Sequence, residues 1–590
     1  MIEIQPYGII VILMISGMLK YKSMRKILLI TFLALFFLPF FRPFKAQAFD
    51  LDYSNNKFGI HLAIPAFEDL QKAADLVNAN GDWGYVTLVM EEKDLNKDKW
   101  EGVFNQLRKL HLIPIIRLAT SLENGHWRAP QKEDAQKWAD FLNSLNWVVK
   151  NRYIVLFNEP NRADEWGGRV DPQNFTDVTY NFAKTLKERN PDFFIMMAGL
   201  DSAAPSQPNQ YEDEVIFLKK VLNYQKDLFN YLDGWASHSY PKSYLNYGRN
   251  SQFNYQWELS LLSSLGVKKN LPIFITETGW RHSKGKSLDK SFPSEEKTAQ
   301  LTVNYLNNVL KDNQIVAITP FILNYQDEPF DHYSWQKINS NEFYEPYSAV
   351  QKMIKIKGQP YQEEKLKLIS KLPEKLIKNS IYQISLIIKN EGQGFWDQKD
   401  SYGLIIEGLP VDSRYLFSDF SSLLPFEERK IWLYLKTGEK TEKLKLKISL
   451  TKEGKTVNQI DWDLEIVPEI NIKLITKLLF KSKTTASDFK FLIYNQNEEV
   501  IFSLNDLPVK NGESEIKGLK NLIIGETYRL VLIKPFYLPR QTFLIIDEKE
   551  NQASFKILLP FDFNQDGRFS WGDFSALTKK PKLLKLFLRQ

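Results

Sequence analysis

Eight short apolar runs, each followed by a longer amphipathic segment, constrain the fold of this chain more than any other feature. Several runs are β-branched and apolar throughout, which is typical of strands covered on both faces. The segments between them repeat apolar residues at helical spacing, as in WEGVFNQLRKLH (100–111). The runs are FGIHLA (58–63), WGYVTLVM (83–90), LIPIIRLA (112–119), YIVLFNEP (153–160), FFIMMAGLD (193–201), LDGWASHSY (232–240), PIFITETGW (272–280) and IVAITPFIL (315–323). Eight alternations over about 300 residues predict a (β/α)8 TIM barrel and disfavour an open doubly wound sheet.

The pattern changes after Gly358, so a multidomain chain is predicted. Segments such as KIWLYLKT (430–437) and KLKLKISL (443–450) place apolar residues on one face and lysines or other polar residues on the other, as half-buried sandwich strands do. At 590 residues the chain is also too long for one core. We therefore predict, in order, a catalytic barrel at 52–358, an Ig-like β-sandwich at 360–468, a second β-sandwich at 469–560, and a short calcium loop with a basic tail at 561–590.

The first 48 residues have the pattern of a signal peptide. Arg25 and Lys26 precede the apolar stretch 27–41, and Ala46-Gln47-Ala48 gives the small-x-small pattern of a cleavage site. The basic residues follow Met24 directly, so translation starting at Met24 is an alternative to Met1. The sequence thus predicts a secreted or cell-surface protein, with an uncleaved membrane anchor as the competing interpretation.

Charge and cysteine content exclude several classes of function. The chain has a formal charge of +6, but six lysines and arginines lie before residue 49 against one glutamate, which leaves the remainder nearly neutral. A neutral chain gives no electrostatic reason to expect nucleic-acid binding. The chain has no cysteine, so disulfides and cysteine catalysis are excluded.

Two of the predicted strands end in a carboxylate. Asn158-Glu159-Pro160 closes the fourth run, and Glu277 takes the equivalent place in the seventh. Because the active site of a barrel is built at the carboxyl ends of its strands, both side chains are expected at one rim. One protonated and one ionised carboxyl group facing each other is what glycosidic cleavage requires. The competing interpretation of Glu159 is a structural salt bridge with Arg152 or Arg162.

The pairing of NEP (158–160) with TETGW (276–280) resembles glycoside hydrolase clan A, the cellulase-like superfamily. The resemblance covers about half of the chain. It implies a retaining mechanism with Glu159 as general acid/base and Glu277 as nucleophile. It also implies that Asn158 hydrogen-bonds the sugar 2-hydroxyl, and that His238 and Tyr240 line the cleft.

Further residues near the predicted rim are candidates for substrate binding. Arg117 ends the third run, where it would keep Glu277 ionised or form a rim ion pair. Trp280 and Trp166 are candidate platforms for a sugar ring, with core packing as the alternative for each. The eighth run departs from the family pattern, which often carries a platform tryptophan there; Tyr325 or Trp335 would replace it.

Near the C-terminus, FDFNQDGRFSWGDFSALTKK fits the spacing D-x-N-x-D-G-x5-D. This spacing wraps oxygen ligands around Ca²⁺. The segment resembles a single dockerin repeat, which makes a cohesin-type or cell-surface partner a further expectation; an Asp-rich turn is the alternative. The basic tail PKLLKLFLRQ is interpreted as a solvated terminal helix or as a contact with an anionic wall or membrane surface. The predicted ligands are Asp562, Asn564, Asp566, the Arg568 carbonyl and Asp573.

The sequence as a whole predicts a secreted retaining glycosidase acting on β-linked oligo- or polysaccharides. We expect a monomer that needs no cofactor for catalysis. The alternative is a non-catalytic carbohydrate-binding or cell-surface protein on a barrel scaffold, but such a protein would be expected to lose Glu159 or Glu277. A metal-dependent barrel enzyme is disfavoured because the six histidines show no H-x-H or H-E-x-x-H spacing.

Overall fold

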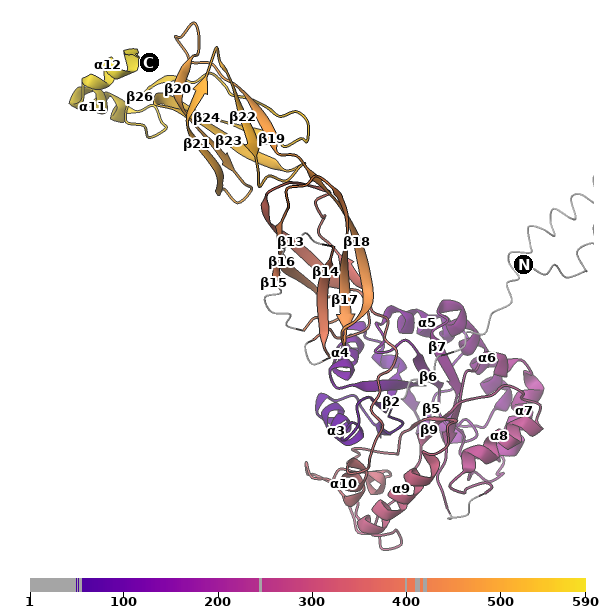
Figure 1. Ribbon diagram of the computed structural model, residues 1–590. Coiled ribbons are helices and arrows are strands. Elements are labelled where there is room, and N and C mark those ends of the chain that lie inside the picture. The colour runs from indigo at the N-terminus through magenta and orange to yellow at the C-terminus, as the bar shows by residue number, and fades with distance from the viewer. Residues whose placement is uncertain are drawn as a thin grey trace, which may run out of the picture. The chain divides into compact units, whose positions relative to one another are not determined.

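The computed structural model describes residues 49, 51, 56–242, 247–397, 400–408, 414–416 and 422–589. The predicted signal peptide, 1–48, lies outside these residues. Within the described part of the chain, no helix combines the length and the apolar character needed to cross a bilayer. The chain is multidomain, with an α/β region followed by a region rich in sheets (Figure 1).

Eight parallel strands form the centre of the α/β region, and each overlaps one of the eight predicted runs. Their residues are almost all buried, which explains the continuously apolar composition. The strands are β1 (Gly59–Leu62), β2 (Gly84–Glu91), β3 (Leu112–Ala119), β6 (Arg152–Leu156), β7 (Phe193–Met197), β8 (Trp235–His238), β9 (Ile273–Glu277) and β10 (Ile315–Ile318).

The eight strands are joined into a ring. Five of them pair in the order β1-β2-β3-β6-β7 and three in the order β10-β9-β8. Two isolated parallel bridges join these sheets, Met196 to Gly234 and Phe58 to Ile318. All eight strands therefore run in one direction, so that their carboxyl ends meet at one rim.

Helices surround the ring (Figure 1). Their apolar faces are buried and their polar faces are exposed, as the helical spacing predicted. Asn96, Asp171 and Ser294 cap three of them by accepting backbone N–H groups. The helices are α3 (Phe67–Val77), α4 (Lys97–Lys109), α5 (Asp134–Ser144), α6 (Pro172–Arg189), α7 (Glu214–Tyr224), α8 (Asn254–Ser264), α9 (Glu295–Val309) and α10 (Glu345–Gln351).

Short elements at the rim position side chains of the site. The hairpin of β4 (Leu122–Glu123) and β5 (His126–Trp127) follows β3. The 3-10 turn η3 (Ala163–Glu165) follows β6. The other 3-10 turns are η2 (Glu92–Asp94), η4 (Leu228–Asn230) and η5 (Asp331–Tyr333).

The sheet-rich region begins with two four-stranded sheets, which we call the first sheet pair. Their inward residues share one apolar core that contains Trp396 and Trp462. Strict alternation of buried and exposed residues in β13 and β16 reproduces the predicted pattern. In pairing order, the strands of one sheet are β11 (Leu366–Leu368), β13 (Ile381–Asn390), β16 (Glu428–Lys436) and β15 (Arg414–Leu416). Those of the other sheet are β12 (Lys375–Ile377), β18 (Lys455–Val467), β17 (Lys443–Lys452) and β14 (Tyr402–Glu407).

The second sheet pair includes part of the predicted calcium segment. Strand β26 pairs with β24, and Phe563 and Phe587 belong to the same core as the sheets. The segment after residue 560 is thus packed on the sheets by its aromatic side chains. In pairing order, the strands of the three-stranded sheet are β22 (Glu513–Leu519), β19 (Ile470–Ile475) and β25 (Gln552–Ser554). Those of the five-stranded sheet are β21 (Val500–Val509), β20 (Ala486–Tyr494), β23 (Thr527–Lys534), β24 (Phe536–Ile545) and β26 (Pro560–Asp562). Helices α11 (Trp571–Lys579) and α12 (Lys582–Arg589) follow.

A buried arginine connects the α/β region to the first sheet pair. Arg108 of α4 is 1% exposed and donates from Nε to the Gln393 carbonyl over 2.7 Å. Its Nη2 donates to the Trp147 carbonyl over 3.1 Å. Burial lowers the pKa of Arg108 to about 10, which leaves it charged at neutral pH.

Candidate active site

Both predicted glutamates lie at the carboxyl rim of the ring. Glu277 is the last residue of β9, and Glu159 follows β6 by three residues. The backbone turns sharply between β6 and Glu159, with φ of 71° at Phe157 and 27° at Glu159. Such left-handed conformations are unfavourable for side chains larger than glycine and cluster at functional sites. This turn lifts Glu159 out of the strand and aims it across the ring.

The two carboxyl groups meet on one histidine. One oxygen of Glu159, one oxygen of Glu277 and a ring nitrogen of His238 all lie within 4.8 Å of one another. His238 Nδ1 is 2.8 Å from Glu159 Oε1 and 3.7 Å from Glu277 Oε2. All three side chains are buried.

Glu277 is surrounded by positive charge and a hydrogen-bond donor. The Tyr240 hydroxyl donates to Glu277 Oε2 over 2.9 Å, and Arg117 Nη1 lies 3.3 Å from Oε1. Burial by itself would raise the pKa of Glu277, but attraction to His238 and Arg117 more than offsets it and leaves the pKa below its usual value. Glu277 is therefore ionised at neutral pH.

Glu159 has the opposite electrostatic environment. Burial raises its pKa, and the negative charge of Glu277 adds to this effect, while the hydrogen bond to His238 opposes it. Arg162, the partner in the salt-bridge interpretation, lies 3.6 Å from Glu159 Oε2. However, its guanidinium group makes shorter contacts to Asp164, at 2.7 and 3.1 Å. The pKa of Glu159 is thus raised above its usual value, opposite to the shift of Glu277.

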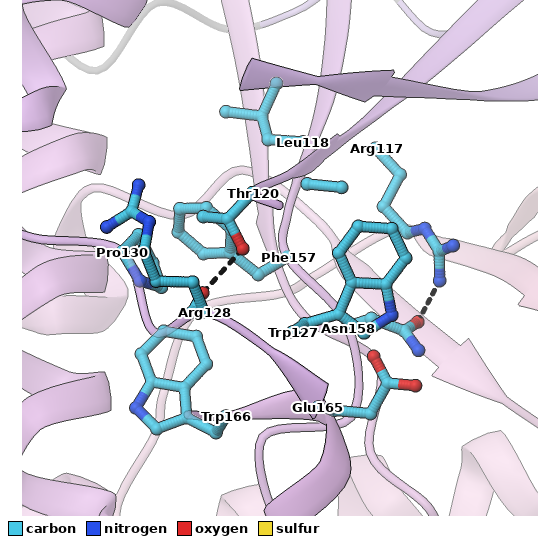
Figure 2. Close-up of a pocket in the computed structure, with 11 residues that line it drawn as sticks. Arg117, Leu118, Thr120, Trp127, Arg128, Pro130, Phe157, Asn158, Glu165 and Trp166 are labelled. Atoms are coloured by element: carbon cyan, nitrogen blue, oxygen red, sulfur yellow. Dashed lines mark hydrogen bonds between the residues drawn. The ribbon is translucent and has the colours of Figure 1, made fainter. Parts of the chain in front are cut away.

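Asn158 is held from two sides. Arg117 donates to its side-chain oxygen, and its amide group is hydrogen-bonded to Glu165. Figure 2 shows these three side chains lining a pocket beside Trp127, with the Glu165 carboxyl group directed toward Asn158. Burial, aided by the charge of Glu159, raises the pKa of Glu165 to about 7. A third titratable carboxyl group therefore lies next to the pair.

The two tryptophans predicted as sugar platforms differ in how far they are exposed. Trp280 is half-buried, with its ring edge-on to Tyr305. Trp166 is 1% exposed and packs edge-on between Phe157 and Phe175. Trp166 is therefore buried, in line with the core-packing alternative, although it also lines the pocket of Figure 2, and its role as a platform stays a prediction.

The eighth strand contributes aromatic side chains of a different kind. Trp335 is buried and Tyr325 is half-buried. Phe321 lies edge-on to His61 and to Tyr333, and Tyr333 lies 6.0 Å from Tyr240 between ring centroids. These rings form a wall beside the glutamates.

Sequence reasoning missed four residues of the site. His61, at the end of β1, has Nε2 3.8 Å from Glu277 Oε1, and burial lowers its pKa to about 3, so it is neutral. Trp127, Glu165 and Tyr333 come from short loops. For His61 a signal existed, since it is a polar residue near the end of a predicted strand. For the others, position in a short polar segment gave none.

Among the described residues, the carboxylate pair and His238 form the one group of three His, Cys, Asp or Glu side chains whose ligand atoms all lie within 4.8 Å of one another. The donors around Glu277 do not suit a cation. Tyr240 already donates to one oxygen and the Arg117 guanidinium lies against the other, so a metal would meet positive charge at close range. The arrangement fits proton transfer and nucleophilic attack better than metal binding.

The predicted calcium loop has a turn that leaves one carboxylate oxygen free. Gly567, at φ 78°, donates its N–H to Asp562 Oδ2 over 3.1 Å. Asp562 is 2% exposed, and its Oδ1 has no hydrogen-bond partner. Asp573 accepts the N–H groups of Asn564 and Ser570. Burial raises the pKa of Asp562, as does the charge of Asp573 and Asp566 nearby.

Comparisons with known proteins give matches among solved structures alone. No family model matches the chain. No curated protein matches it either. Similar structures include a family 39 glycoside hydrolase from the gut symbiont Bacteroides cellulosilyticus WH2, with 15% identity, a TM-score of 0.37, and coverage of 65% of this chain and 80% of that one.

Two other similar structures are also named as glycoside-cleaving enzymes. A family 51 α-L-arabinofuranosidase from Bifidobacterium longum has 9% identity and a TM-score of 0.35, covering 83% of this chain and 98% of that one. A Cellulomonas fimi endo-β-1,4-mannanase has 10% identity and a TM-score of 0.30, covering 69% and 94%.

Proposed function

We propose that the α/β region is a (β/α)8-barrel glycoside hydrolase that cleaves β-linked oligo- or polysaccharides with retention of configuration, and that the two sheet pairs are non-catalytic β-sandwich modules. The observation that carries this proposal is the approach of the Glu159 and Glu277 carboxyl groups, with atoms within 4.8 Å, in environments that drive their pKa values apart. Retaining glycosidases keep their two carboxyl groups about 5–5.5 Å apart, whereas inverting ones leave about 6.5–9.5 Å for a water molecule.

In this mechanism Glu277 attacks the anomeric carbon while Glu159 protonates the departing glycosidic oxygen. The Glu277 oxygen forms an ester with the sugar, and the leaving group departs as an alcohol. Glu159, now ionised, removes a proton from water, whose oxygen then displaces Glu277. Arg117 and Tyr240 orient Glu277, and His238 orients Glu159.

The decisive test compares Glu277→Ala, Glu159→Ala and the exposed control Glu188→Ala on aryl β-glycosides. We expect Glu277→Ala to abolish turnover, because no nucleophile remains, and azide to restore it with an inverted glycosyl azide as product. Glu159→Ala should lose about a hundred- to ten-thousandfold on poor leaving groups but less on activated ones. Wild-type rates in either variant, or an inverted sugar product from the wild-type protein, would refute the mechanism.

The same experiment separates catalysis from a non-catalytic carbohydrate-binding role. A binding protein would leave every aryl glycoside and soluble glucan, mannan or xylan intact while retaining affinity for one of them. Export to the cell surface or medium, which the N-terminal sequence suggests, suits an enzyme acting on polymers too large to enter cells.

We also propose that the loop 562–573 binds Ca²⁺. The buried, unpartnered Oδ1 of Asp562 supports this proposal, because such an oxygen is costly unless a proton or a cation meets it. Asp562, Asn564, Asp566, the Arg568 carbonyl and Asp573 supply the oxygen ligands that Ca²⁺ prefers. The ion would stabilise the packing of the C-terminal segment and take no part in catalysis.

Calcium should therefore raise the melting temperature of the second sheet pair. At a hundred times the dissociation constant the gain is about 2.7 kcal/mol. Asp562→Ala should remove the response, whereas Asp506→Ala, in strand β21, should keep it. A melting temperature that millimolar calcium leaves unchanged would contradict the proposed calcium site.

A further inference from the structure

The C-terminal end of the second sheet pair exposes apolar side chains that the glycosidase proposal does not use. Phe480 is 77% exposed and Leu588 is 68% exposed. Phe561, Leu584 and Leu586 are exposed as well. We call these five side chains the tip patch. Large apolar groups gathered in water usually indicate a surface that another body covers.

The tip patch is organised around one buried ring. Phe587 of α12 packs into the core and lies 5.7 Å from Phe561 between ring centroids. Phe561 in turn lies 6.5 Å from Phe480. Leu586 and Leu588 flank Phe587 in the sequence, so the exposed leucines belong to the helix that carries this buried ring.

The apolar face of α12 is wider than the surface that it covers. At about 100° per residue, its five apolar residues span an arc of about 200°. Leu583 and Phe587, one turn apart, face the core. The remaining leucines lie at the two edges of the arc and stay exposed. A helix that needed only to cover the sheets would carry polar residues at these edges.

The segments that carry the tip patch are rich in positive charge. Residues 477–485 and 561–588 contain eight lysines and arginines against three aspartates, and all three aspartates lie in the proposed calcium loop. Lys483, Lys582 and Lys585 are exposed. A second copy of this chain would bring like charges together, and a soluble anionic polymer would leave the leucines in water. An anionic bilayer satisfies both features.

The neighbouring helix α11 carries a further side chain suited to a bilayer. Trp571 is 85% exposed and lies 5.5 Å from Phe574 between ring centroids. Tryptophan favours the boundary between lipid headgroups and acyl chains, because its ring is apolar and its N–H is polar. We propose that the tip patch docks the protein on a lipid bilayer rich in anionic headgroups.

The absence of cysteine from the chain allows a local test in the full-length protein. A single Leu586→Cys is labelled with an environment-sensitive fluorophore, and Lys268→Cys, exposed in the α/β region, serves as the reference. Vesicles of phosphatidylglycerol and phosphatidylcholine should shift the emission of the first label to the blue, and lipids with quenchers in their acyl chains should reduce it. The reference label should not respond. A response of the Leu586→Cys label alone distinguishes docking by the tip patch from binding through the N-terminal segment.

Two variants separate the apolar and electrostatic contributions. Lys582→Glu/Lys585→Glu should weaken binding at least about tenfold, because each lysine attracts anionic lipid. Leu584→Ser/Leu588→Ser should abolish acyl-chain quenching. Both variants should keep the wild-type melting temperature and hydrolytic rate.

Three outcomes would overturn the proposal. One is a Leu586→Cys label that does not respond to phosphatidylglycerol vesicles. Another is an equal response to vesicles of pure phosphatidylcholine, or to soluble polyglycerol phosphate. The third is a concentration-dependent dimer without lipid that the leucine variant abolishes, which would assign the patch to a second copy of the chain.

Discussion

At the scale of single residues, the site depends on three carboxyl groups that differ through their surroundings. Glu277 has a lowered pKa because positive charges oppose its burial, and Glu159 has a raised one because burial prevails. Activity should therefore fall at low pH when Glu277 gains a proton, and at high pH when Glu159 loses one. Glu165, hydrogen-bonded to Asn158, has its pKa raised to about 7 by burial, with a further contribution from the charge of Glu159.

Replacing Glu165 should move the alkaline limit of activity. The charge of Glu159 raises the pKa of Glu165, and because the repulsion is mutual, the Glu165 carboxylate also favours the protonated form of Glu159. In Glu165→Gln the pKa of Glu159 falls, so the alkaline limb of kcat/KM should shift to lower pH by on the order of half a unit. The exposed control Glu123→Gln should leave the profile in place, and an unshifted limb in Glu165→Gln would exclude the coupling.

At the scale of elements, strand ends bring the site together, and the space between them is narrow. Gly199 follows β7, and a Cβ atom there would lie 2.2 Å from Cδ2 of His238. Glycine at this position lets the imidazole ring pack against the neighbouring backbone and reach Glu159.

Gly199→Ala should therefore displace His238. We expect kcat to fall, since Glu159 loses its orienting hydrogen bond, and stability to fall by about 1–3 kcal/mol from overpacking. The matched control is Gly102→Ala in α4, where an added Cβ meets nothing within 4 Å. That change should stabilise the helix by about 0.5–1 kcal/mol. Similar kinetics in Gly199→Ala and wild type would contradict this role of His238.

The strands and the carboxylates at their ends could be predicted, because burial imposes apolar runs and the break in each run marks its exit. Arg117 was found by the same logic, whereas Tyr240 was named through the family resemblance. Trp166 could not be placed, since a tryptophan in a loop has the same sequence signature whether its faces contact sugar or Phe175. Glu165 and Trp127 were missed because polar loops show no periodicity. The packing of Phe587 into the core could not be predicted, because the sequence of an amphipathic helix does not show which surface its apolar face contacts.

At the scale of the whole molecule, the α/β region and the first sheet pair share buried polar contacts. Arg108 donates hydrogen bonds to carbonyl groups of both regions, and Gln393 donates to the Val149 carbonyl over 3.0 Å. Gln362 donates to the Val148 carbonyl over 2.9 Å. These hydrogen bonds are inaccessible to water, so a carbonyl group that loses its donor lowers the free energy of unfolding.

Arg108→Met should lower the free energy of unfolding by about 3 kcal/mol, because methionine keeps the aliphatic volume but leaves buried carbonyl groups without donors. Denaturant unfolding followed by tryptophan fluorescence measures this loss. Arg189→Met, in an exposed ion pair with Asp140, should change it by less than about 0.5 kcal/mol. Equal losses in the two variants would show that the buried bonds contribute nothing.

The way the ring closes has a consequence for how substrate binding affects motion. The five-stranded sheet carries Glu159 and the three-stranded sheet carries Glu277, and isolated bridges join the two sheets at Met196–Gly234 and Phe58–Ile318. Glu159 and Glu277 thus belong to two different sheets, which isolated bridges join on either side. If the proposed function holds, a sugar bound by both glutamates would link the two sheets across these bridges, and we expect it to slow amide hydrogen exchange there.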